Sequence, residues 1–433
     1  MPHASLPILT IAFAMWLVAL LARVQDQSWT SPSSIFALIW AAYIPTLLFF
    51  VDDAQVYVKG MIWILVSVLA VAAGSAIAGT ISPGFASKSV VASPRTASLL
   101  TKLTVIGIFV GLLDAGWLFV ARGVALGDIF SFKALMLVSA ANRGEAYAGE
   151  LETPVFERVA FTMIYLGTLY GGVLFKLSKR RSDKVIAIFA LLVLILINTL
   201  HGSRFGSIYG GAFWLSAYLA ATVALANPVR NTGSAFLIRF ALAGILIVFV
   251  FSILTMTVRY ELFADNPAAR VGWAYMLSDP FGFIAAFGVW FNESGMHDSA
   301  PMYGARVFRR IAGLWGKSYP LYGPVDVGFN ASNVYTIFRE LIDDFTLWGS
   351  LEMLLFYGFA ARMVFWRTTL RVSRVGLPLL AIAYIFAFTG VASSAFAYTT
   401  ITAALIMFVA SFLFLPPVSL PTAQRISSPA GAE

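Results

Sequence analysis

Cysteine is absent from this chain, and histidine occurs only at His3, His201 and His297. The absence of cysteine excludes disulfide bonds and thiolate metal ligands. The sequence also lacks a P-loop, a GxGxxG motif and an HExxH motif, which are common signatures of nucleotide, dinucleotide and zinc sites. We therefore expect no cofactor and no bound metal.

Charge is scarce as well, since Asp, Glu, Lys and Arg make up only 12% of the residues. Hydrophobic residues make up 60%, and the mean hydropathy is +0.84. A soluble domain cannot bury so much apolar surface. Several runs also reach the roughly 17 to 25 residues with which a helix crosses a bilayer. The sequence predicts an all-α, polytopic integral membrane protein.

Stretches without charge, bounded by charged or turn residues, predict about eleven transmembrane helices. The expected spans are 5–22, 35–51, 61–78, 103–120, 159–175, 185–200, 208–226, 240–258, 345–365, 376–391 and 395–415. They form a single transmembrane domain over residues 1–415, and a disordered cytoplasmic tail follows at 416–433. The first span lacks the basic start of a signal peptide, so we expect it to be retained.

Lysine and arginine in short loops indicate which helix ends face the cytoplasm. The basic loop 176–184 and the arginines between residues 362 and 374 fall on the same side when eleven spans are counted. The amino terminus is then external. A twelfth span at 271–291 would invert every later loop, and Asp279-Pro280 interrupts it. We expect a re-entrant or surface-lying segment there instead.

Two long external regions, 122–158 and 259–344, carry many arginines. Positive charge usually gathers on the cytoplasmic side, and a guanidinium binds phosphate oxygens with paired donors. We therefore expect a lipid-linked phosphate or diphosphate as the ligand, with Arg143, Arg204 and Arg339 converging on it. For any single arginine, ion pairing with acidic residues on the same side is the alternative.

The turn before Arg204 offers further donors, because the backbone amides of His201-Gly202-Ser203 can bind the same anion. The alternative for Arg204 is an interfacial side chain that reaches lipid headgroups. A general base that removes a hydroxyl proton would be a carboxylate. Candidates for the base are Glu145, Asp326, Glu340, Asp343 and Asp344. No spacing distinguishes them, and a helix start is the alternative for Asp343-Asp344.

A short pattern near the end of the second external region is the most specific in the chain. It contains Asn333-Val334-Tyr335-Thr336, then Arg339, then Asp344-Phe345 and Gly349. This pattern resembles the signature of oligosaccharide repeat-unit polymerases, the Wzy-type O-antigen and exopolysaccharide polymerases. Asn142-Arg143-Gly144-Glu145 and Gly202-Ser203-Arg204 resemble that family as well. One position departs from it, since residue 346 is often glycine in these proteins and is Thr346 here.

The resemblance implies a helical bundle like that of GT-C glycosyltransferases, in the bacterial inner membrane, with a site that faces the periplasm. It implies transfer of a growing glycan from undecaprenyl diphosphate to a new lipid-linked repeat unit, without nucleotide or metal. The expected catalytic residues are Arg204, Arg339, Asp344 and Glu145. The expected substrate-binding residues are Arg143, Arg259, Asn333, Tyr335, Thr336 and His201. Expected partners are the lipid-linked glycan donor and acceptor, membrane lipids and a chain-length regulator, but no nucleic acid.

Two alternative functions fit a similar layout. O-antigen ligases transfer a lipid-linked glycan to lipid A core and rely on a histidine in the large external loop, where this chain has His297. A flippase or other transporter would line a path through the bundle with charged residues. Few charged residues fall inside the expected spans, which disfavours transport.

Overall fold

The structure is a computed structural model that describes residues 2–49, 56–81, 94–128, 131–148, 154–225, 282–293, 301–309, 322–328, 331–332, 334–370 and 375–414. Most of these residues are helical. The α-helices are α1 (Pro2–Asp26), α2 (Pro32–Tyr43), α3 (Val58–Ile81), α4 (Pro94–Ala121), α5 (Phe132–Ala148), α6 (Val155–Leu177), α7 (Arg181–Leu200), α8 (Arg204–Leu225), α11 (Gly282–Glu293), α13 (Ile337–Leu370), α14 (Gly376–Thr389) and α15 (Thr399–Phe414).

Short elements complete the described part of the chain. Three 3₁₀ helices are η1 (Ile44–Phe49), η2 (Leu126–Asp128) and η5 (Ala395–Ala397). Two short strands, β1 (Val325–Asp326) and β2 (Ala331–Ser332), pair antiparallel with Val325 opposite Ser332. The described part of the chain is therefore a helical bundle with one small hairpin.

Six of the described helices are long and apolar enough to cross a bilayer, namely α1, α3, α4, α6, α7 and α8. The prediction of an all-α membrane protein is confirmed at this level. Every expected span except 240–258 overlaps a helix, and 240–258 lies outside the described residues. The count of eleven spans stays a prediction.

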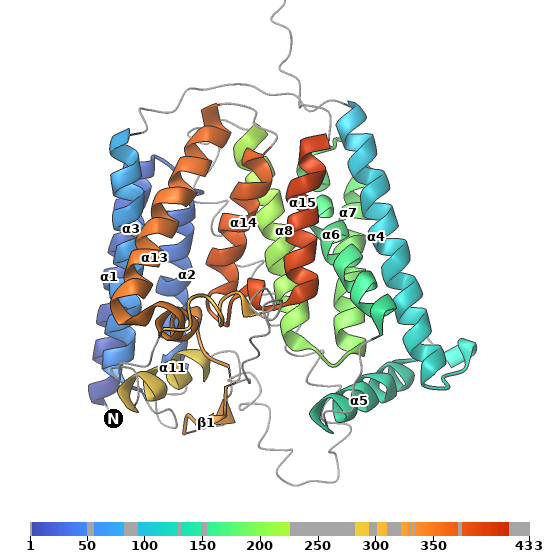
Figure 1. Ribbon diagram of the computed structural model, residues 1–433, viewed down its shortest axis with the longest axis horizontal. Coiled ribbons are helices and arrows are strands. Elements are labelled where there is room, and N and C mark those ends of the chain that lie inside the picture. Colours follow the sequence, from blue (N-terminus) through green and yellow to red (C-terminus); the bar gives the residue numbers. More distant parts are fainter. Residues whose placement is uncertain are drawn as a thin grey trace, which may run out of the picture.

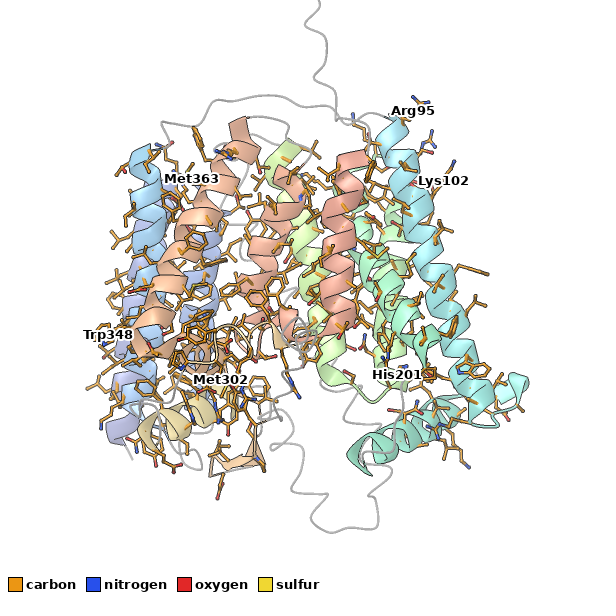
Figure 2. All side chains as sticks on the ribbon, in the orientation of Figure 1. Arg95, Lys102, His201, Met302, Trp348 and Met363 are labelled. Carbon is orange, nitrogen blue, oxygen red and sulfur yellow. The ribbon has the colours of Figure 1, made fainter. Side chains whose placement is uncertain are left out.

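The two ends of the bundle carry different features. Figure 2 places Met363 and Arg95 at one end, and His201 and Met302 at the other. The α6–α7 turn lies at the Met363 end (Figure 1), so the two basic loops expected in the cytoplasm share that end. Helices α5 and α11 lie across the opposite end, together with β1 and the first residue of α1.

Glycines allow a close helix crossing between α3 and α13. A Cβ atom on Gly74 would overlap the carbonyl oxygen of Leu355, and one on Gly358 would overlap that of Val71. In lipid, where water does not drive helices together, small residues allow the backbones to approach and gain packing contacts. This crossing holds α13 against the first helices of the chain.

Helix α11 is a short helix that does not cross the bundle. Its 12 residues span about 18 Å at 1.5 Å per residue, well below the roughly 30 Å hydrocarbon core. All residues from Gly282 to Phe291 are buried, and α11 packs against α3, η1, β1 and α13. This position agrees with the expected re-entrant or surface-lying segment, of which residues 271–281 lie outside the described part.

Helix α13 bends soon after it begins. Thr346 has φ 68° and ψ 177°, which divides α13 into a first part, 337–345, and a second part, 347–370. The Thr346 hydroxyl accepts the N–H of Gly349 at 3.5 Å and so caps the second part. The N–H of Ile337 donates to the carbonyl of Gly390 at 3.0 Å, which ties the first part to the end of α14. The first part of α13 carries the candidate site.

Candidate functional site

Three aromatic rings surround the guanidinium of Arg339 in the first part of α13. Its Cζ lies 3.8 Å from the ring centre of Tyr322, 3.9 Å from that of Tyr335 and 4.9 Å from that of Trp290. Aromatic faces attract a cation, and they hold the planar guanidinium in position. We call this arrangement of Trp290, Tyr322 and Tyr335 the Arg339 cage.

Two guanidinium nitrogen atoms of Arg339 are available for a further partner. Within the described part of the chain, Nε and Nη1 are buried and have no hydrogen-bond partner. The carboxylate of Asp343 is 3.9 Å from Nε, which is too long for a hydrogen bond. A buried donor without an acceptor is costly. A phosphate oxygen from a ligand would satisfy these donors with charge-assisted bonds.

The cage itself is held by hydrogen bonds. The Tyr322 hydroxyl donates to Oδ2 of Asp343 at 2.8 Å, and the Tyr335 hydroxyl donates to the carbonyl of Gly323 at 2.9 Å. The Cζ atom of Arg306 lies 4.6 Å from the Tyr322 ring centre. The guanidinium groups of Arg306 and Arg339 therefore both lie against the ring of Tyr322, and the hydroxyl of Tyr322 is hydrogen-bonded to the carboxylate of Asp343.

Asp344 binds the backbone of residues 302–308 rather than the cage. Its carboxylate accepts the N–H of Val307 at 2.7 Å and the N–H of Arg306 at 2.8 Å. Its own carbonyl accepts the N–H of Tyr303 at 2.9 Å. These bonds fix the segment that supplies Arg306, so Asp344 acts here as a support for the site.

Glu340 lies on the side of α13 that carries Asp344, and it faces the α14–α15 connection. Its side chain is buried, and Oε2 accepts the backbone N–H of Ser394 at 2.9 Å. The neighbouring Ser393 accepts or donates a hydrogen bond with the Tyr209 hydroxyl on α8 at 2.7 Å. Glu340 thus lies where α8, α13 and the end of α14 meet.

The three carboxyl groups precede the kink at Thr346, outside the six long apolar helices. Burial raises the pKa of Glu340 to about 8, although the Ser394 N–H opposes the shift and the charge of Asp344 adds to it. Burial also raises the pKa of Asp344 to about 6, against the N–H groups of Val307 and Arg306. The pKa of Asp343 is raised by burial, against the hydrogen bond from Tyr322. Glu340 and Asp344 therefore change protonation on either side of neutral pH, Glu340 at about 8 and Asp344 at about 6.

Thr336 adds an unpaired hydroxyl next to these groups. It precedes α13 by one residue and is fully buried, and its carbonyl accepts the N–H of Arg339 at 3.1 Å. In the part of the chain that the structure describes, its Oγ1 has no hydrogen-bond partner. Of the expected site residues, Tyr335 and Thr336 contact Arg339, whereas Asp344 binds the backbone of Arg306 and Val307.

His201 belongs to a different cluster. Its Nε2 is 3.7 Å from Oδ2 of Asp114, a fully buried residue of α4, and its ring centre is 4.7 Å from that of Phe161. Nearby, Asn142 of α5 donates to the carbonyl of Leu200 at 2.9 Å. Figure 2 shows His201 well away from Met302, whose N–H donates to the carbonyl of Asp343 in α13 at 3.1 Å. The expected grouping of His201 with Arg339 is therefore not seen.

The expectation that the 201–203 amides bind an anion is wrong, because these amides already have acceptors. The N–H groups of His201, Gly202 and Ser203 donate to the carbonyls of Ile197, Thr199 and Asn198 at 2.8 to 3.0 Å. The turn uses its donors to close α7, whose last carbonyls need partners. The Ser203 hydroxyl then accepts the N–H of Gly206 at 3.2 Å and caps α8.

Several expected site residues cannot be placed. Arg204 begins α8, and Arg143 and Glu145 lie on α5. The structure describes the backbone of these three residues but not their side chains. Arg259, Asn333 and His297 lie outside the described residues altogether. The convergence of Arg143, Arg204 and Arg339 on one anion stays a prediction.

Sequence reasoning did not select Trp290, Tyr322 or Arg306 as members of the site. Trp290 reads as part of an apolar helix, and Tyr322 and Arg306 precede α13 by long stretches of chain. Neither helical nor strand spacing links them to Arg339. An alternation of aromatic and arginine residues in the 302–322 region is the signal that sequence offers.

Among the described residues, no group of three His, Asp or Glu side chains could hold a metal ion. The arrangement of Arg306, Arg339 and the three carboxyl groups is suited to binding an anion beside a group that exchanges a proton. The chain matches no protein-family model, no curated protein and no solved structure.

Proposed function

We propose that this protein is a membrane glycosyltransferase that polymerises lipid-linked oligosaccharide repeat units. The growing chain would be transferred from undecaprenyl diphosphate to a new lipid-linked unit, on the periplasmic face of the bacterial inner membrane. The observation that carries the proposal is the Arg339 guanidinium, held in its aromatic cage with Nε and Nη1 unpaired, beside the carboxyl group of Asp343.

Two features of the site fit the chemistry of this reaction. The departing lipid diphosphate gains negative charge, and a fixed guanidinium stabilises such charge without having to reorganise. The attacking hydroxyl must lose a proton, and a carboxyl group with a pKa near neutral can accept it. The site also adjoins the lower end of the apolar bundle (Figure 1), where a lipid-linked substrate would approach with its tail in the bilayer.

A reconstituted reaction tests the proposal directly. The gene is deleted in its host, and the accumulated lipid-linked repeat units are extracted and supplied to the purified protein in liposomes. A ladder of polymer on undecaprenyl diphosphate is the expected product. Transfer to added lipid A core without a ladder would instead make the protein a ligase. Movement of repeat units across the bilayer without any new glycosidic bond would make it a transporter.

Matched variants connect the product to the site. Arg339→Lys keeps the positive charge but loses the planar set of donors and the fit to the cage. The polymerisation rate should fall at least about tenfold, which corresponds to the loss of one to two charge-assisted hydrogen bonds. Glu352→Gln removes a carboxylate from an exposed position of the same helix and should leave the rate unchanged. Equal rates in the wild type and Arg339→Lys would remove the basis for the proposal.

A further inference from the structure

The first part of α13 and the two residues before it carry two neighbouring rows of side chains. Tyr335, Arg339 and Asp343 are four residues apart and contact one another through the cage and the 3.9 Å Arg339–Asp343 approach. Thr336, Glu340 and Asp344 follow at the same spacing. Tyr335 and Thr336 immediately precede α13. Within α13, successive residues point about 100° apart, so Glu340 and Asp344 face a different direction from Arg339 and Asp343. We call them the arginine row and the glutamate row.

The two rows have different partners. The arginine row lies among Trp290 and Tyr322, and its unpaired atoms are hydrogen-bond donors on Arg339. The glutamate row faces the backbone of Ser394 through Glu340 and the backbone of Val307 through Asp344. An anion fits the first row, and a group that can donate a proton fits the second.

Within the glutamate row, Asp344 and Glu340 differ in how many further hydrogen bonds their carboxylate oxygens can accept. Asp344 accepts N–H bonds from Arg306 and Val307 with both of its oxygens. Glu340 has one oxygen in a bond to the Ser394 N–H. Four residues earlier, immediately before α13, Thr336 is fully buried and, among the described residues, its Oγ1 has no hydrogen-bond partner. A ligand hydroxyl that bound between Thr336 and Glu340 would satisfy this orphaned group.

We propose that Thr336 and Glu340 form the subsite for the acceptor, and that Glu340, rather than Asp344, takes the proton of the attacking sugar hydroxyl. The inference rests on the proposed function. A bond forms between the acceptor oxygen and the anomeric carbon of the donor glycan. The bond from that carbon to the phosphate oxygen breaks, and its electron pair leaves with the diphosphate, which the arginine row holds. The hydroxyl proton moves to the Glu340 carboxylate.

The burial of Glu340 suits this role. A general base works best when its pKa lies near the working pH, and the pKa of Glu340 is about 8. The Ser394 N–H binds the ionised carboxylate and keeps it oriented. The polymerisation rate of the wild type should therefore rise with pH between about 6 and 8 as Glu340 ionises.

The test uses the full chain in liposomes with lipid-linked repeat units extracted from the deletion strain. The variants are Glu340→Gln, Glu340→Asp, Thr336→Val and Arg339→Lys, with Glu352→Gln as the control. Two quantities are measured: the rate of ladder formation between pH 6 and 9, and the shift in melting temperature caused by undecaprenyl diphosphate, which reports binding without turnover.

Glu340→Gln should lower the rate of ladder formation by at least about 100-fold, which is the usual size of a general-base effect. The same variant should keep the shift in melting temperature that undecaprenyl diphosphate causes. Glu340→Asp should retain part of the rate and its rise with pH. Thr336→Val should lower the rate by roughly tenfold, as the loss of one hydrogen bond implies. Arg339→Lys should lose the shift, because its position binds the diphosphate.

Each contrary result has a defined meaning. A rate in Glu340→Gln within twofold of the wild type would overturn the inference, even if the protein is a polymerase. A Glu340→Gln variant could also have the melting temperature of the wild type but show no shift in it with undecaprenyl diphosphate. That result would assign Glu340 to positioning of the donor and would overturn the inference too. A wild-type protein that forms no ladder would remove the proposed function, and the inference with it.

Discussion

The carboxylate of Asp344 accepts the backbone N–H of Val307 at 2.7 Å, so one side chain of α13 holds the segment that supplies Arg306 to the site. Asp344→Asn keeps one acceptor oxygen and loses the charge, and the bonds from Arg306 and Val307 weaken. We expect a loss of about 1–3 kcal/mol in stability and faster hydrogen exchange at residues 303–308.

The matched control for this prediction is Asp128→Asn, which changes an exposed aspartate in η2. It should leave both the melting temperature and the exchange of residues 303–308 unchanged. If Asp344→Asn were as stable as the wild type but inactive, Asp344 would act in the chemistry rather than as a support.

The kink residue Thr346 gives a second prediction. Its φ of 68° with ψ of 177° lies in a region that is open mainly to glycine. Such a conformation costs on the order of 1–3 kcal/mol in a residue with a side chain. Thr346→Gly should therefore raise the melting temperature in detergent. Thr346→Ala keeps the strain and loses the bond to the Gly349 N–H, so it should melt below the wild type, and the reverse order would contradict the interpretation.

Thr346 also illustrates what the sequence could predict. Residue 346 is the one position at which the sequence departs from the pattern that it resembles, where glycine is common. The positive φ of Thr346 explains why glycine would be favoured at this position. Composition and apolar runs sufficed for the all-α membrane bundle, because length and hydropathy determine which segments can cross a bilayer. The short pattern around Arg339 sufficed to select Tyr335 and Thr336, which contact Arg339.

The cage and the roles of the carboxyl groups could not be predicted in the same way. Trp290 and Tyr322 reach Arg339 through tertiary packing, which leaves no periodic signal in the sequence. The difference between Glu340 and Asp344 depends on which backbone N–H groups face them, those of Ser394 and those of Arg306 and Val307. The amides of residues 201–203 were misjudged because the sequence does not reveal that they close α7.

The α3–α13 crossing should tolerate no side chain at its contact points. Gly74→Ala and Gly358→Ala each place a methyl group against a backbone carbonyl of the facing helix, so the helices must separate. We expect a loss of about 1–3 kcal/mol for each, measured as a lower melting temperature in detergent. Gly116→Ala is the control, since a Cβ atom there meets nothing within 4 Å. An equal effect at Gly116 would show that glycine itself, rather than the crossing, matters.

A buried ion pair near the Met363 end of the bundle should be needed for assembly. Oδ1 of Asp26 lies 2.6 Å from Nη1 of Arg362, and the hydroxyl of Ser33 donates to Oδ2 at 2.6 Å. Asp26→Asn leaves the Arg362 charge buried without its counter-charge, which costs about 3–5 kcal/mol. The double variant Asp26→Asn/Arg362→Met removes both charges and should recover much of the loss. Additive losses in the double variant would mean that the two residues act independently.

The buried acid Glu340 should make the stability of the protein depend on pH. Its folded-state pKa of about 8 lies above the ordinary value of 4.5, so the folded chain keeps a proton that the unfolded chain releases. The resulting stabilisation is complete below about pH 4.5 and is lost as the pH rises through about 8, by roughly 1.4 kcal/mol per pH unit. Glu340→Gln lacks this dependence.

The melting temperature of the wild type should therefore fall relative to that of Glu340→Gln between pH 5 and 8 and then run parallel to it. A constant difference across this range would mean that Glu340 is already ionised in the folded protein, and its assignment as a base with a near-neutral pKa would fail.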